Sequence, residues 1–328
     1  MSFVGAVRTH WLDFLTSASD ALQHGTVAAW KSVPGGPQEP DYVSKLIQVS
    51  VPHLATHWIK LFQQLNCLST VFGAFVHQSP KIHYVGMQGD SVEVGDILFV
   101  HVHWPKNAGP RSAALLLQAK KSPLGCLVPA IPDDQFRLYY EWPELTYVSP
   151  TGLKGRIRDV LPKQDHAGAQ YLLIDPAPIR RPHMPNRWSS VYGTAKTEPS
   201  MNTEIPLELA LCALLTKSSG RTFDISPSAK DGWSLFINDL LNHTLVSFYN
   251  RRAANANRQP RLAPRIYGNS NANSKRGIVV VLLGEDKASQ LLSGFGKNPP
   301  DTDDLAIPAE PPEGISIVVV ETFESEAG

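Results

Sequence analysis

The chain has 328 residues, of which 42% are hydrophobic and 18% are charged. This composition is typical of a globular protein with one large or two modest domains, and no stretch approaches the ~20 consecutive apolar residues that a membrane-spanning helix needs. The N-terminal segment lacks the cleavage site of an export signal, so we expect a cytoplasmic protein without a membrane partner. The odd number of widely spaced cysteines argues against a disulfide framework and a cysteine-based zinc site.

The formal net charge of zero conceals a separation of charge along the chain. Residues 251–276 include seven basic side chains and no acidic one, whereas residues 298–328 include eight acidic side chains and no basic one. A basic stretch rich in Asn, Arg and Pro can follow a phosphate backbone, and it can equally be a solvated surface loop. The candidate nucleic-acid-binding residues are Arg251, Arg252, Arg258, Arg261 and Arg265.

In the first half of the chain, the apolar pattern predicts helix followed by sheet. Apolar residues recur at three- and four-residue steps over residues 42–67, which predicts one or two helices with a bend at Val51-Pro52. Runs rich in β-formers predict short strands at residues 71–76 and 82–87. Two further runs, at residues 97–104 and 113–121, predict a hairpin around a Pro- and Gly-containing turn. A further helix is expected to begin near Pro132 and to end at Trp142-Pro143.

In the second half, residues 151–200 are rich in Pro, Gly and Arg and predict an irregular connection with one strand at 171–175. Helices are then expected around residues 205–215 and 233–249, and very apolar strands at 278–283 and 315–320. The mixture predicts an α/β fold. We expect a nuclease-like core over residues 1–150, the connection over 151–200, and a helical and strand extension over 201–328 that packs on the core.

The hairpin carries the residues that suggest chemistry. Side chains at alternate positions of a strand share one face, so Gln118 and Lys120 point the same way while Ala119 faces the opposite layer. Asp96 stands at the start of the partner strand, where a closed hairpin brings it near the end of the second strand. A metal-dependent phosphodiesterase needs a divalent ion held by hard oxygen ligands. It also needs a cationic side chain nearby that stabilises the phosphate.

These residues resemble the signature of the restriction-endonuclease-like nucleases, which is an Asp, a β-hairpin, then Glu or Gln, any residue, and Lys. Here Gly95-Asp96 is followed after twenty-one residues by Gln118-Ala119-Lys120, and the resemblance covers residues 38–145. It implies a mixed central sheet flanked by helices, with additional C-terminal helices and strands. It also implies that Asp96 and Gln118 bind Mg²⁺ or Mn²⁺, and that Lys120 positions water or stabilises developing charge.

The chain departs from the family pattern in two places. Gln118 stands where many members carry an acid, and a neutral amide supplies an oxygen without a negative charge. The family often supplies another Glu from its first helix, whereas the helix predicted here contains none; Glu39, just ahead of it, and Glu93, three residues before Asp96, are the additional candidate metal ligands.

Three interpretations follow from these residues. The first is a metal-dependent endonuclease that hydrolyses DNA as a subunit of a prokaryotic restriction or anti-phage defence system, a setting that rests on the family alone. The second is a catalytically inactive nuclease fold that acts as a scaffold or nucleic-acid-binding subunit of a larger complex, and the third is an unrelated α/β protein.

His53 and His57 have helical spacing, but no Glu follows His53 as a metalloprotease helix requires.

Overall fold

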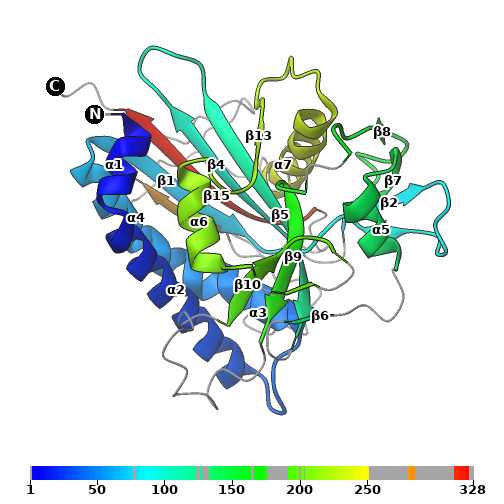
Figure 1. Ribbon diagram of the computed structural model, residues 1–328, viewed down its shortest axis with the longest axis horizontal. Helices are drawn as coiled ribbons and strands as arrows, with labels where there is room; N and C mark the ends of the chain where they lie inside the picture. The colour runs from blue at the N-terminus through cyan, green and yellow to red at the C-terminus, as the bar shows by residue number, and fades with distance from the viewer. Residues whose placement is uncertain are drawn as a thin grey trace.

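The computed structural model describes residues 2–76, 79–122, 126–127, 133–163, 166–175, 191–198, 201–202, 204–250, 280–284 and 314–324. Within these ranges, the fold is a mixed α/β structure in which helices flank a large central sheet (Figure 1). No helix in the described ranges is both long enough and apolar enough to cross a membrane.

The chain begins with a layer of helices that precedes the sheet. These are α1 (Phe3–Thr9), α2 (Trp11–Ser32), α3 (Glu39–Lys45), the π-helical turn η1 (Leu46–Ser50) and α4 (Val51–Gln64). The helical segment predicted over residues 42–67 is confirmed, and it is divided by η1 immediately before Val51-Pro52. A proline lacks the amide hydrogen and crowds the preceding turn, which explains why the regular helix restarts there.

Helix α2 was not anticipated from the sequence. Its buried positions repeat with helical spacing, but many of them are small or polar, including Ala18, Ala21, Gly25, Thr26 and Ala29. A pattern that is recognised through large apolar side chains is weak when the buried face is made of small ones.

The central sheet has nine strands in the order β12-β10-β9-β5-β4-β15-β1-β14, and β13 pairs with β5 off this path. Their bounds are β1 Cys67–Ala74, β4 Ile97–Trp104, β5 Arg111–Lys121, β9 Ala169–Ile174, β10 Tyr192–Ala195, β12 Ile205–Pro206, β13 Arg221–Phe223, β14 Val280–Gly284 and β15 Ser316–Glu324. The pairs β15–β4 and β5–β9 are parallel, and the remaining pairs are antiparallel. The predicted hairpin is therefore confirmed, and the predicted C-terminal strand lies in the middle of the sheet.

Two smaller sheets accompany the central one. One has four strands in the order β3-β2-β7-β8, and the other pairs β6 with β11. Their bounds are β2 Lys81–Tyr84, β3 Val92–Glu93, β6 Cys126–Leu127, β7 Leu145–Ser149, β8 Ile157–Arg158 and β11 Met201–Asn202. The region expected as an irregular connection thus contains the one strand predicted there, β9, and two that were not predicted, β8 and β10.

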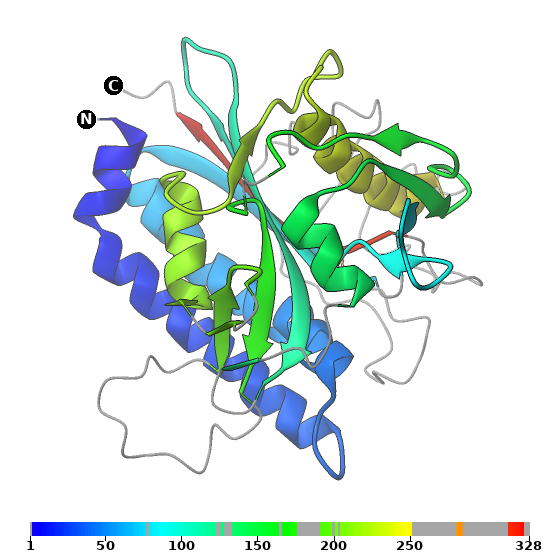
Figure 2. The same ribbon diagram turned by 45° about the vertical axis from the view of Figure 1, so that its right-hand side comes forward.

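The central sheet has two buried faces. On the first face, alternate strand residues pack against α1 to α4 and against α6 (Leu207–Leu215). On the second face, they pack against α5 (Asp134–Glu141), α7 (Gly232–Asn250) and the strands β2 and β7 (Figures 1 and 2). Leu115 and Leu117 belong to the first face and Leu116 to the second, so the intervening alternation places Gln118 and Lys120 on the second face.

Candidate functional site

The candidate site starts at Gly95, which links β3 to β4. A Cβ at this position would stand 2.7 Å from the Tyr139 hydroxyl oxygen and 2.9 Å from Leu116 Cδ1. The same hydroxyl donates a 2.7 Å hydrogen bond to the carbonyl of Val94. Only glycine lets the backbone pass this closely under Tyr139, and the close passage sets where Asp96 enters the sheet.

Asp96 and Gln118 face each other across the hairpin. Ile97 pairs with Leu117, and the Asp96 amide donates a 2.9 Å hydrogen bond to the Leu117 carbonyl, which puts Asp96 opposite Gln118. The Asp96 carboxylate accepts a hydrogen bond from the Gln118 side-chain amide and one of 2.8 Å from the Ala119 backbone amide. The apposition predicted from the sequence is therefore present.

The Asp96 carboxyl group lies where a negative charge is unfavourable. Its pKa is raised to about 7, mainly by burial and also by the Glu93 and Glu39 carboxylates, whereas the Ala119 hydrogen bond and the Lys120 ammonium act in the opposite direction. Desolvation disfavours the charged form, and a second negative charge does the same. A cation bound beside Asp96 would reverse both effects.

Gln118 has an orphaned oxygen. Its side chain is 7% exposed, and its Oε1 atom is buried without a hydrogen-bond partner among the described residues. An unsatisfied buried amide oxygen costs about 1–3 kcal/mol, so such atoms usually have an additional partner. An amide oxygen is also a hard ligand of the kind that Mg²⁺ and Mn²⁺ accept.

Lys120 lies two residues beyond Gln118 on the same face. Its side chain is partly exposed, and its charge acts on Asp96 by lowering the pKa of that carboxyl group. Within the described part of the chain, no hydrogen bond or ion pair ties up its ammonium group. This leaves a cation beside the carboxylate that can meet an anionic group.

Glu39 and Glu93 reach the same region from other elements. Glu39 is the first residue of α3, and its Oε1 accepts a 2.8 Å hydrogen bond from the Lys121 backbone amide at the end of β5. The sequence interpretation put Glu39 ahead of the helix, whereas it occupies the first helical position. Glu93 is the last residue of β3, and its carboxylate raises the pKa of Asp96. Among the described residues, no hydrogen bond joins Glu93 to Asp96.

These donors fit a hard divalent cation in chemistry, although not as a ready cluster of carboxylates. Asp96, the orphaned Gln118 oxygen and the nearby Glu93 and Glu39 carboxylates are all oxygen ligands. Within the described ranges, however, the only three His, Cys, Asp or Glu ligand atoms that lie within 4.8 Å of one another come from Asp20, His24 and His53. Glu39, Glu93 and Asp96 are thus too dispersed to hold one ion together without a change in side-chain position.

Two aromatic residues near the site were not recognised from the sequence as part of it. Tyr171 on β9 pairs with Gln118, and its ring meets that of Tyr139 edge-on with centroids 5.8 Å apart. Burial, the neighbouring Tyr171 and the Asp96 carboxylate raise the pKa of the Tyr139 hydroxyl well above its usual value. Local pattern could not associate these residues with Asp96, because Tyr171 reaches the site through the parallel β5–β9 pairing and Tyr139 through the packing of α5 against Val94.

The proposed phosphate-contacting arginines, Arg251, Arg252, Arg258, Arg261 and Arg265, lie outside the described residues.

Comparisons of the chain with protein-family models, with curated proteins and with solved structures find no match.

Proposed function

We propose that the chain is a metal-dependent endonuclease that hydrolyses phosphodiester bonds of DNA. The observation that carries the proposal is the apposition of Asp96 and Gln118 with Lys120 on the same face, reached by Glu39 from the preceding helix. This arrangement has the order and spacing of the restriction-endonuclease-like signature, and α5 follows the hairpin as the family's next helix does. The family resemblance also suggests a cytoplasmic subunit of a prokaryotic restriction or anti-phage system.

In this proposal, Asp96 and Gln118 Oε1 hold Mg²⁺ or Mn²⁺, with Glu93 and Glu39 as additional candidate ligands. The bound ion would polarise the scissile phosphate and acidify an attacking water. The amide of Gln118 exchanges its oxygen and nitrogen positions by rotation, so the oxygen can face a cation next to Asp96. Lys120 neutralises charge on the phosphate, which is why its ammonium must stay out of internal ion pairs.

The test is cleavage of supercoiled plasmid and single-stranded DNA with Mg²⁺, with Mn²⁺ and with a chelator. Asp96→Asn and Lys120→Ala should each lower the cleavage rate by about 100-fold or more. The first removes the carboxylate that would hold the metal ion, and the second removes the ammonium group that would neutralise charge on the phosphate. Lys106→Ala is the matched control, since Lys106 is exposed in the turn at the far end of the same hairpin. A wild-type enzyme whose Asp96→Asn variant cleaves equally fast would exclude this assignment.

A catalytically inactive nuclease fold is the second candidate, and a specific observation favours it. The Asp96 carboxylate is already hydrogen-bonded by two donors, and Glu39 already accepts from the Lys121 amide. Such a network can close a former metal site and leave a scaffold or nucleic-acid-binding subunit. Titration with Mn²⁺ separates the two candidates: binding that depends on Asp96 supports the enzyme, and the lack of binding at millimolar metal supports the scaffold.

A further inference from the structure

A second cluster of ligand-type side chains lies in the helical layer, where α2 and α4 cross. The contacts between them show that the two helices run in opposite directions. Trp58 Nε1 of α4 donates to the Phe14 carbonyl at 3.3 Å and to Ser17 Oγ at 3.1 Å, whereas Ser50, the last residue of η1 just before α4, faces Gly25. A Cβ on Gly25 would stand 2.1 Å from Ser50 Oγ and 3.2 Å from the Lys45 carbonyl oxygen. Glycine thus allows the helices to approach closely at this point.

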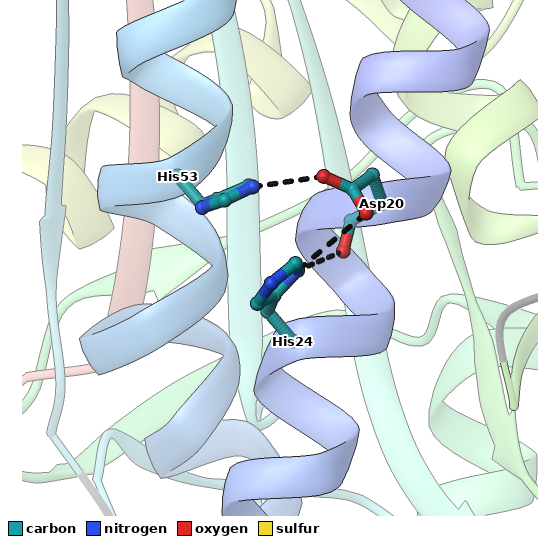
Figure 3. A group of neighbouring side chains, drawn as sticks. All are labelled: Asp20, His24 and His53. Carbon is teal, nitrogen blue, oxygen red and sulfur yellow. Dashed lines mark hydrogen bonds and ion pairs between the residues drawn. The ribbon is translucent and has the colours of Figure 1, made fainter.

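Between these two contacts, three side chains converge from the two helices. Asp20 and His24 are one turn apart on α2, and His53 projects from α4 towards the Asp20 carboxylate (Figure 3). His53 Nε2 lies 2.8 Å from Asp20 Oδ2, and His24 Nδ1 lies 3.6 Å from Asp20 Oδ1 and 2.9 Å from the Asp20 carbonyl oxygen. One ligand atom from each residue lies within 4.8 Å of the other two.

An ordinary surface ion pair accounts for only part of this arrangement. Asp20 and His53 would form such a pair by themselves, yet the His24 ring is stacked on the His53 ring with centroids 4.1 Å apart. Two imidazole rings therefore share one carboxylate at close range. A single cation held by two neutral imidazoles and the carboxylate satisfies all three groups at once.

We propose that Asp20, His24 and His53 form a binding site for a borderline divalent cation of the Zn²⁺ class. Imidazole nitrogen with a carboxylate oxygen suits Zn²⁺, Co²⁺ or Ni²⁺, whereas Mg²⁺ prefers oxygen ligands. The side chains of Asp20, His24 and His53 are 48%, 52% and 32% exposed, so an ion can enter from solvent and water can complete its coordination.

The ion would join α2 to α4 at the crossing. Both helices cover the first face of the sheet, whereas Gln118 and Lys120 lie on the second face, so this site is separate from the one around Asp96. A ligand that binds only the folded chain stabilises it. The predicted role is therefore a clamp on the helical layer, and it does not depend on the proposed nuclease activity.

The experiment is a Zn²⁺ titration of the chelator-treated full chain, in competition with a chromogenic chelator, together with the visible absorption of bound Co²⁺. Wild-type protein should bind one equivalent that His53→Gln, His24→Gln or Asp20→Asn weakens by about tenfold or more, with loss of the Co²⁺ bands. Zn²⁺ should also raise the wild-type thermal midpoint more than it raises those of the variants.

His10→Gln is the matched control, because His10 also pairs with an aspartate of α2, Asp13, at 3.3 Å, and this pair is in no group of three ligands among the residues that the structure describes. This variant should keep the wild-type Zn²⁺ equivalent. Circular dichroism of each variant verifies that the helices remain folded. Equal Zn²⁺ affinity in wild-type protein and all three site variants, or no binding by the wild-type protein, would overturn the proposal.

Discussion

Asp96 and Gln118 meet where a buried carboxylate accepts a hydrogen bond from an amide whose own oxygen has no hydrogen-bond partner among the described residues. The two groups are hydrogen-bonded to each other, and the pKa of Asp96 is raised to about 7 mainly by burial. Burial makes a negative charge on Asp96 unfavourable, and a cation beside the carboxylate would offset that charge. The charge balance at Gln118 is therefore the most informative feature to change.

Gln118→Glu should lower stability without metal and raise the affinity for Mg²⁺ by about tenfold or more, because a second carboxylate joins Asp96 and then binds the ion directly. The measurement is the thermal midpoint over a series of Mg²⁺ concentrations. Gln64→Glu adds the same charge at the exposed end of α4 and should show no added Mg²⁺ dependence. A Gln118→Glu variant as insensitive to Mg²⁺ as this control would contradict a metal role for the position.

Gly95→Ala should cost about 1–3 kcal/mol of unfolding free energy, because its Cβ meets the Tyr139 hydroxyl at 2.7 Å and Leu116 at 2.9 Å. Chemical denaturation measures this cost. Gly109→Ala serves as the control, since a Cβ there has no atom within 4 Å. In a Tyr139→Phe background the cost of Gly95→Ala should shrink, and an unchanged cost would show that the hydroxyl does not limit the space.

At the scale of elements, the hairpin and the helical segment over residues 42–67 could be predicted, and helix α2 could not. The predicted strands at 97–104 and 113–121 correspond to β4 and β5, because β-formers flank a turn and local sequence fixes the register. That register also gives the apposition of Asp96 and Gln118. Helix α2 was missed because its buried face is small-sided, and β7 and β10 because short strands are defined by distant partners.

The pair β4–β15 contains a buried imidazole whose state depends on pH. His101 Nε2 and His103 Nδ1 lie 3.2 Å and 3.0 Å from the Thr322 hydroxyl oxygen of β15. Both imidazole rings stack against the ring of Phe3 of α1. Burial, assisted by the neighbouring His103, lowers the pKa of His101 from 6.5 to about 3. The folded protein thus keeps His101 neutral under conditions that protonate it in the unfolded chain.

Because this pKa is depressed in the folded state, the contribution of His101 to stability is present above about pH 6.5 and is lost as pH falls towards 3. Between about pH 6.5 and about pH 5 the loss amounts to up to about 2 kcal/mol. His101→Gln should reduce the pH dependence of the unfolding free energy by this amount. His83→Gln, at an exposed position of β2, should leave it as in the wild type, and identical pH profiles for all three proteins would refute the assignment.

At the scale of the molecule, β15 joins the two halves of the central sheet. It pairs with β4 on one side and β1 on the other, and Ser316 Oγ donates to the Val76 carbonyl at 2.6 Å. Its first seven residues are buried. The sequence predicted this strand from its apolar run, but not its central place, since no local pattern states which strands will be neighbours.

Truncation after Gly314 should therefore abolish cooperative unfolding, because β1 and β4 lose their shared partner and expose apolar edges. Thermal and denaturant scans followed by circular dichroism measure the loss. Removal of residues 325–328 leaves β15 complete and should preserve the transition. A cooperative transition in the chain that ends at Gly314 would show that the rest of the sheet folds without β15.

The central place of β15 also determines when the protein can fold during synthesis. Val76 and Ser316 touch in the finished sheet, yet 240 positions separate them in the chain. While the ribosome translates the intervening codons, the edges of β1 and β4 that will accept β15 have already been made and remain unpaired. The nascent chain therefore exposes these two strand edges until β15 has left the exit tunnel.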